Sequence, residues 1–154
     1  MLDDVDLRLL ALLQQNAKLT IKELAEQLSM TTTPIFERIK RMERDGVIER
    51  YVALVNAEKV GRPLVVFCNV SMPDYTPENI AEFEETIRQM SDVLDAYHLA
   101  GTIDYQLKVL TLDIKEYAQF LQQLAKLPMI RVHSSAIALY AVKQSTVVPT
   151  SLKS

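Results

Sequence analysis

The apolar residues of the first fifty positions recur every three or four residues, which is the period of an amphipathic helix. Three such runs are separated by short polar breaks, and Gly46 follows the third. Thr20, with Glu23 three residues later, predicts a capping box at the start of the second run, and Thr31 is a good N-cap for the third. The apolar faces consist of Leu2, Val5, Leu9, Leu12 and Leu13, then Ile21, Leu24, Ala25 and Leu28, then Ile35, Ile39 and Met42. Three helices with a tight turn before the third predict a helix-turn-helix.

The pattern changes after the Gly61-Arg62-Pro63 boundary, since Pro63 cannot continue regular strand pairing. Strand-like and helical segments then alternate. The predicted order is strand 64–72, helix 77–90, strand 93–100, strand 105–112, helix 113–127 and strand 132–142. This βαββαβ order is that of a ferredoxin-like domain.

These segments predict an α+β chain in four parts. A helix-turn-helix domain occupies residues 1–50, and residues 51–63 form a hinge strand and linker. A ferredoxin-like domain for ligand binding and dimerisation occupies residues 64–142, and residues 143–154 are a polar C-terminal tail. The stretch VIERYVALVN after Gly46 is interpreted as extended, either as a wing or as a hinge strand.

The first strand of the second domain indicates a partner. Residues 64–68 are Leu-Val-Val-Phe-Cys, which alternate too little for one face to meet water, so we expect both faces to be buried. Helices cover one face of such a sheet, and a symmetric homodimer would cover the other. Two recognition helices about 34 Å apart would then bind a roughly palindromic DNA site.

Composition excludes several classes of protein. A single cysteine, Cys68, excludes an internal disulfide framework and a multi-cysteine zinc site. Met1 and Leu2 are followed at once by DDVD, and no apolar run approaches the roughly 18 to 20 residues of a membrane helix. We therefore expect a cytoplasmic protein with no membrane partner. The net charge is −3, and residues 1–60 carry nine Lys and Arg against ten Asp and Glu. Any DNA binding must therefore depend on a local arrangement of charge.

The third helical run contains the candidate DNA contacts. With its apolar face inward, we expect Arg38 and Arg41 to project together from the outer face. Arg38 could reach a guanine edge or a phosphate, and Phe36 could pack in the domain or touch a thymine methyl group. The alternative is a solvated helix with Glu37–Arg41 and Lys40–Arg44 pairs. The predicted DNA-binding residues are Thr31, Thr32, Thr33, Arg38, Lys40 and Arg41.

The sequence Gly-Thr-Ile-Asp at positions 101–104 is the candidate effector loop. Gly101 permits close approach of the backbone, Asp104 could hold an ammonium group, and backbone N–H groups could bind a carboxylate. These groups fit a zwitterionic amino acid, while the alternative is a plain hairpin turn. No catalytic or metal-binding spacing occurs, because His98 and His133 lie on different predicted strands. We therefore expect neither an enzyme nor a metal or cofactor site.

The chain resembles the leucine-responsive/asparagine regulator family (Lrp/AsnC, also called feast/famine regulators). The pattern LD..D..IL..L, then ELA, a hydroxyl-rich turn, R-I and G-[VI]-I fits residues 2–56, and HLAGTIDYQLKVLTLD, LPMI and AVKQST fit the effector domain. The resemblance implies a transcriptional regulator, an amino-acid effector, and a dimer that assembles into tetramers or octamers. By resemblance, Gly101 and Asp104 belong to an effector loop in which Thr102 replaces an acidic residue and Ile103 an aromatic one. Ser135 aligns with a hydroxyl position near the ligand.

The leading hypothesis is a cytoplasmic, nucleoid-associated regulator that binds double-stranded DNA in a sequence-specific way and responds to a small molecule. Two alternatives stay open. The first is an enzyme on the same frame, since siroheme decarboxylases resemble this family and His98 could serve one. The second is an architectural protein that wraps DNA with low specificity.

Overall fold

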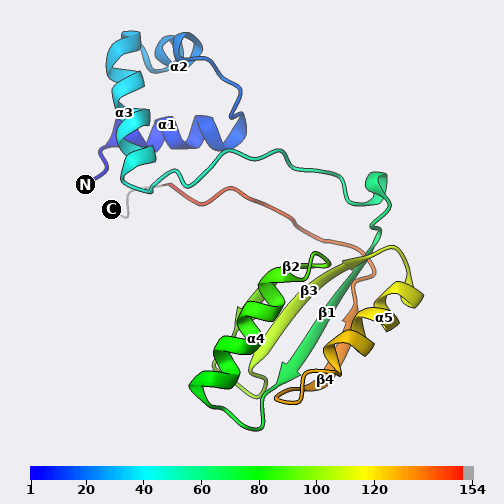
Figure 1. Cartoon of the computed structure of the whole chain (residues 1–154). Helices are drawn as coiled ribbons and strands as arrows, with labels where there is room; N and C mark the ends of the chain where they lie inside the picture. Colours follow the sequence, from blue (N-terminus) through cyan, green and yellow to red (C-terminus); the bar gives the residue numbers. More distant parts are fainter. Residues whose placement is uncertain (151–154) are drawn as a thin grey trace. The chain divides into compact units, whose positions relative to one another are not determined.

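The computed structural model describes residues 1–150, which divide into two compact units (Figure 1). The first unit contains Met1–Leu54 together with the tail from Lys143, and the second is Val55–Val142. The linker predicted over residues 51–63 is thus shared between the two units. None of the helices in the described residues is long and apolar enough to cross a membrane.

Three helices form the first unit: α1 (Asp4–Gln15), α2 (Ile21–Leu28) and α3 (Thr32–Arg44). The capping box at Thr20 and Glu23 is confirmed, because each side chain accepts a hydrogen bond from the other's backbone N–H. Thr31 occupies the N-cap position of α3, but its side chain makes no capping hydrogen bond. A second capping box, formed by Asp3 and Asp6 at the start of α1, was missed by the sequence analysis.

The core of the first unit follows the predicted apolar faces. Leu9, Leu24, Ile35 and Met42 are buried almost completely. The turn between α2 and α3 is made by Ser29, whose φ of 53° lies in the left-handed region, and Met30 N–H donates to the carbonyl of Ala25. Leu2, Val5, Leu12 and Ile21 lie at the edge of this core and are only partly buried.

The predicted wing or hinge strand is absent from the single chain. Residues 49–56 form no ladder with any described residue, and a short 3-10 helix, Glu58–Val60, leads into Gly61. An extended segment becomes a strand only when a neighbour accepts and donates its backbone hydrogen bonds.

The C-terminal tail belongs to the first unit instead of standing apart as a polar extension. The side-chain amide of Gln14 on α1 donates to the carbonyl of Val148 over 3.0 Å, and the N–H of Val148 donates back to Gln14 Oε1 over 2.6 Å. Thr146, Val148, Pro149 and Thr150 line one side of a pocket of about 940 Å³ beside α1. The tail therefore packs on α1 as a short peptide.

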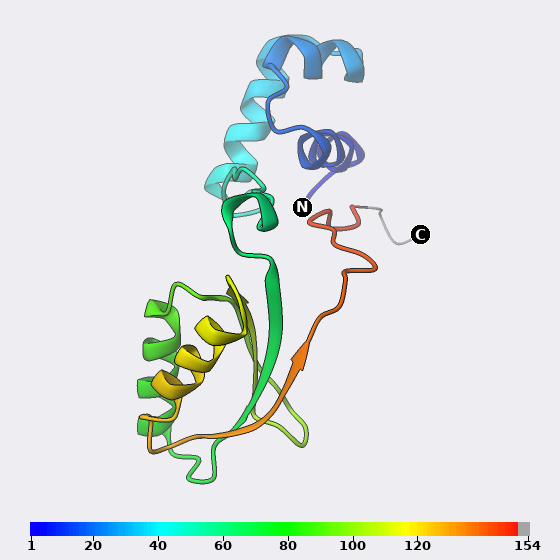
Figure 2. The same cartoon turned by 90° about the vertical axis from the view of Figure 1, so that its right-hand side faces the viewer.

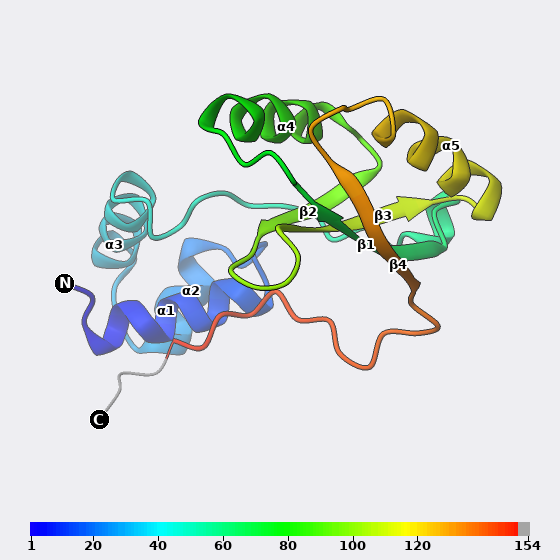
Figure 3. The same cartoon turned by 90° about the horizontal axis from the view of Figure 1, so that it is seen from below.

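The second unit has the predicted βαββαβ order. Its elements are β1 (Leu64–Ser71), α4 (Pro77–Gln89), β2 (Val93–His98), β3 (Tyr105–Thr111), α5 (Ile114–Leu124) and β4 (Arg131–Ile137). The sheet order is β2-β3-β1-β4, with every neighbouring pair antiparallel. Both helices cover the same face of the sheet (Figures 2 and 3). β4 ends at Ile137, five residues before the predicted end, because residues 138–142 have no further partner strand in the described chain.

The two faces of the sheet differ in burial. Val66, Cys68 and Val70 on β1 point toward the helices and are fully buried with Leu107 and Val109 of β3. The opposite face carries Val65, Phe67, Asn69, Gln106, Lys108 and Leu110, which are all half-buried. In the single chain, β1 is therefore buried fully on one face only.

Candidate nucleic-acid interface and effector loop

The outer face of α3 is defined by the side chains opposite its buried stripe. Ile35, Ile39 and Met42 are buried, as predicted. Successive residues of a helix are about 100° apart around its axis. The residues roughly opposite the buried stripe are therefore Thr33, Glu37, Lys40 and Arg44, and Phe36 lies at the border of the stripe. The side chains exposed on this helix are Thr32, Thr33, Phe36, Glu37, Lys40 and Arg44.

The expectation that Arg38 and Arg41 project outward is wrong. Nη1 of Arg38 donates to Asp6 Oδ1 over 2.7 Å and to Asp3 Oδ2 over 2.6 Å, and Nη2 of Arg41 donates to Asp6 Oδ2. The Arg38 side chain is only 23% exposed and that of Arg41 is 40% exposed. Arg38 lies about 60° from the buried stripe on a helix of 3.6 residues per turn, so its guanidinium group reaches α1.

Asp6 is the centre of this ion cluster, and its side chain is 0% exposed. Its two carboxylate oxygens accept from Arg38, Arg41 and the backbone N–H of Asp3. The backbone N–H of Asp6 and the guanidinium group of Arg38 lower the pKa of Asp3. The carboxylates of Asp3 and Asp6 in turn raise the pKa of Arg38. The cluster joins the start of α1 to the middle of α3 and neutralises two positive charges of the recognition helix.

The tip of α3 carries Thr31, Thr32 and Thr33, all exposed. None of their hydroxyl groups makes a hydrogen bond to a residue in the described range 1–150. Thr31 caps no N–H group, and Pro34, the third residue of the helix, has none to offer it. The tip therefore presents three hydroxyls together with the unpaired backbone N–H groups of Thr32 and Thr33. These groups are suited to binding phosphate oxygens.

Lys40 lies beside two groups on the outer face. Its Nζ is 2.8 Å from Glu43 Oε2 and 5.9 Å from the centroid of the Phe36 ring. The hydrogen bond from Lys40 lowers the pKa of Glu43 most, and a hydrogen bond from the hydroxyl group of Tyr51 lowers it further. The Glu37–Arg41 pair of a merely solvated helix does not form, because Arg41 binds Asp6. Lys40 and Arg44 do not pair either, because both are cations, and each binds a carboxylate instead.

The candidate effector loop is the connection between β2 and β3 at residues 99–104. Leu99 N–H donates to the carbonyl of Asp104 over 2.8 Å, which closes the loop. Asp104 Oδ2 accepts from the N–H of Met72 over 2.6 Å, and Asp104 N–H donates to the carbonyl of Val70. The carboxylate is thus anchored to the end of β1, while Gly101 and Thr102 are exposed.

Ser135 does not lie beside this loop within one chain. On β4 it pairs with Cys68, whereas Tyr105, next to Asp104, pairs with Val70. Two strand spacings and two residues along β1 put the Cα atoms of Ser135 and Tyr105 roughly 12 Å apart. The hydroxyl of Ser135 is instead 2.6 Å from that of Tyr117 on α5.

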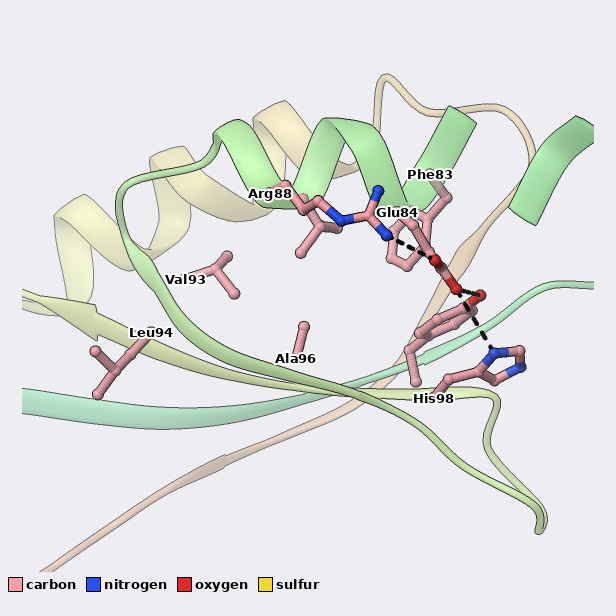
Figure 4. Close-up of a pocket in the computed structure, with 9 residues that line it drawn as sticks. Phe83, Glu84, Arg88, Val93, Leu94, Ala96 and His98 are labelled. Atoms are coloured by element: carbon pink, nitrogen blue, oxygen red, sulfur yellow. Dashed lines mark hydrogen bonds and ion pairs between the residues drawn. The ribbon is translucent and has the colours of Figure 1, made fainter. Parts of the chain in front are cut away.

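A pocket of about 510 Å³ lies between α4 and β2 (Figure 4). Its polar groups are bonded to one another: Glu84 accepts from Arg88 and from Tyr105 over 3.1 Å, and its Oε1 lies 3.7 Å from His98 Nδ1. His98 Nε2 lies 2.5 Å from the Tyr75 hydroxyl. Within the described residues, no cluster of His, Cys, Asp and Glu could hold a metal ion.

Comparison with known proteins decides the family. Residues 65–148 match the model of the Lrp/AsnC ligand-binding domain, and residues 2–49 match that of a winged helix-turn-helix DNA-binding domain. The chain belongs to the Lrp/AsnC family. As a member of the Lrp/AsnC family it is a DNA-binding transcriptional regulator, so the resemblance found in the sequence and the α+β fold class are both confirmed.

The Lrp/AsnC relatives align over nearly the whole chain. The DNA-binding transcriptional activator DecR of Escherichia coli K12 is 36% identical over 150 residues, covering 97% of this chain and 99% of DecR. An AsnC family regulator from Agrobacterium tumefaciens superimposes with a TM-score of 0.92 at 34% identity, covering 96% and 97% of the two chains. A Neisseria meningitidis transcriptional regulator in complex with L-Met also has a TM-score of 0.92, at 29% identity and 97% coverage of both chains.

Proposed function

We propose that the protein binds specific double-stranded DNA sites through the outer face and tip of α3. In this proposal Thr31, Thr32 and Thr33 bind the phosphate backbone or base edges, and Lys40 binds a phosphate. Arg41 is 40% exposed and uses Nη2 for Asp6, so its other guanidinium nitrogens are proposed to bind a phosphate. Arg38 is proposed to act through Asp6, by holding α3 in place.

The observation that supports this proposal is the separation of charge around α3. The acidic groups that α1 brings to α3, Asp3 and Asp6, are bonded to Arg38 and Arg41 on the inner side. The outer side carries the exposed side chains of Lys40 and Arg44 behind a row of exposed hydroxyls. Each of the two is paired with a neighbouring carboxylate, that of Glu43 or Asp45. Surface ion pairs are weak, so Lys40 and Arg44 can each exchange a carboxylate of the protein for a phosphate of DNA.

Fluorescence anisotropy with duplexes from the upstream region of the protein's own gene tests this function. We expect tighter binding to one duplex than to a shuffled duplex of the same composition. Lys40→Ala should weaken binding to all duplexes and reduce the slope of log K against log salt concentration by about one. Lys22→Ala, an exposed lysine on α2, is the matched control and should leave both quantities unchanged. Equal affinity for every duplex would contradict sequence specificity.

We further propose that an amino acid binds at the loop 101–104. The exposed backbone at Gly101 and Thr102 and the carboxylate of Asp104 support this site, as does the relative whose complex contains L-Met. Ser135 is left out of the site because its hydroxyl group is bonded to Tyr117. Thermal unfolding of the protein with each of the twenty amino acids tests the proposal, since a ligand of the folded state raises the melting temperature.

The proposed assembly is a homodimer through the face of the sheet that α4 and α5 do not cover, with further association into tetramers or octamers. The half-buried apolar residues Val65, Phe67 and Leu110 on that face support it. Phe67→Glu should shift the molar mass measured by light scattering toward that of one chain, whereas Ile114→Glu, at an exposed position at the start of α5, should not.

We propose no catalytic role. The decarboxylase alternative rests on His98, whose ring is bonded to Tyr75 and lies beside Glu84. An unchanged absorbance spectrum after incubation with siroheme would agree with this proposal, and a spectral change would contradict it.

We also propose that this transcriptional regulator resides in the cytoplasm, in association with the nucleoid.

A further inference from the structure

Phe36 is the large apolar side chain that α3 exposes. The side chain is 49% exposed, while the other large apolar residues of the helix, Ile35, Ile39 and Met42, are buried. Phe36 belongs neither to the buried core of the first unit nor to the partly buried residues that pack against it. The ring therefore does not contribute to the core of its own domain, and its half-exposed position between the buried stripe and the outer face needs another explanation.

The neighbours of Phe36 are those of a DNA-reading surface. Thr33 lies one helical turn before it and Lys40 one turn after it, so all three belong to the same row of the helix surface. The ammonium group of Lys40 lies 5.9 Å from the ring centroid, close enough for a cation–π contact. Phe36 is one turn into α3, where the recognition helix of a helix-turn-helix approaches base edges.

The ion cluster draws the two arginines nearest to Phe36 toward α1 and occupies part of each guanidinium group. An arginine reads guanine with two guanidinium N–H groups, but Arg38 donates from Nη1 to both Asp3 and Asp6 and is only 23% exposed. Arg41 is a full turn farther along and is also bonded to Asp6. What α3 offers at its first two turns is instead the methyl group of Thr33, the ring of Phe36 and the carboxylate of Glu37.

In the major groove, an apolar side chain distinguishes one feature above all, the 5-methyl group of thymine. We propose that Phe36 is a specificity-determining residue that packs on the methyl group of one thymine in each half-site. This inference rests on the proposed function, because it requires α3 to enter the major groove. The predicted site is therefore marked by thymine at the position Phe36 reaches.

Replacement of thymine by uracil tests the contact, since uracil keeps every hydrogen-bonding group of thymine and lacks only the methyl group. A preferred duplex is first selected from a random pool, and each thymine is then replaced in turn. For the wild-type protein we expect one position in each half-site at which the dissociation constant rises about fourfold, equivalent to about 0.8 kcal/mol for one methyl group. Phe36→Ala should bind the thymine duplex more weakly and show no further loss with uracil. Lys22→Ala should show the same uracil effect as the wild type.

The outcomes distinguish this inference from the proposed function. Failure of the pool to yield a preferred duplex would contradict sequence-specific binding itself. Two outcomes would overturn the role of Phe36 alone. In the first, no thymine of the preferred duplex is sensitive to replacement by uracil. In the second, the replacement weakens binding of Phe36→Ala as much as it weakens binding of the wild type. Phe36→Leu provides a second variant that keeps an apolar side chain, and it should retain part of the uracil effect. The melting temperature of each variant shows that it is folded.

Discussion

Nη1 of Arg38 lies 2.7 Å from Oδ1 of Asp6, and this contact joins the recognition helix α3 to α1 across 32 residues of sequence. The Asp6 carboxylate is fully buried and also binds Arg41. A buried carboxylate with two guanidinium partners is a charge-assisted and geometrically specific contact. The orientation of α3 relative to α1 therefore depends on a buried acidic residue of α1.

Asp6→Ala should reduce the free energy of unfolding strongly. The substitution removes the hydrogen bonds of Arg38 and Arg41 to Asp6, and a hydrogen bond to a charged group contributes about 1.5–3 kcal/mol. Asp4→Ala is the matched control, because Asp4 is exposed on the same turn and should change stability by less than about 0.5 kcal/mol. Urea titration measures both variants. Equal stability of the two would mean that the cluster does not hold the helices together.

Acid should weaken the first unit through Asp3. The folded pKa of Asp3 is lowered from its ordinary value of 3.8, first by the N–H of Asp6 and then by Arg38. A lowered pKa in the folded protein means that the unfolded chain binds the proton more readily. The contribution of ionised Asp3 to the unfolding free energy is therefore present above pH 3.8 and is lost as the pH falls through the folded pKa. Asp3→Asn should therefore flatten the fall of the unfolding free energy below pH 5. An unchanged slope in that variant would exclude this role.

The tail should stabilise the DNA-binding domain through Gln14. Gln14→Ala removes both hydrogen bonds to Val148, and we expect a loss of about 1 kcal/mol at this partly exposed site. Amide hydrogen exchange at Val148 should become faster at the same time. Gln27→Ala, at an exposed position on α2, should affect neither measurement. Unchanged exchange at Val148 in Gln14→Ala would show that the tail is held by other groups.

Gly101→Ala separates ligand binding from folding in the effector loop. A Cβ atom at Gly101 would meet nothing within 4 Å, and its φ is not in the left-handed region, so the melting temperature without ligand should stay the same. The added methyl group should abolish the rise in melting temperature produced by the amino acid that stabilises the wild type. Asp104→Asn, by contrast, should also lower the melting temperature without ligand, because its carboxylate holds the N–H of Met72. Retention of the full ligand effect in Gly101→Ala would place the effector elsewhere.

Local patterns along the chain predicted most of the fold. The three helices, the Thr20–Glu23 capping box, the buried stripe of Ile35, Ile39 and Met42, and the βαββαβ order all follow from short-range periodicity and capping chemistry. The end of the last strand was placed five residues too late, because apolar residues continue to Val142 while the ladder with β1 stops at Ile137. The length of a strand depends on its neighbour and not on its own composition.

The sequence by itself determined the family, the two domains and the helix that we propose to face DNA. Only the tertiary structure decided which side chains of that helix are available to DNA, since a long arginine side chain turns toward whichever carboxylate lies near, and Asp6 comes from another helix. The same holds for Ser135, which strand register separates from the effector loop, and for the tail, which Gln14 binds from 134 residues away. Periodicity fixes the face of an element on which a residue lies, whereas its partners are fixed by the packing of elements that are distant in sequence.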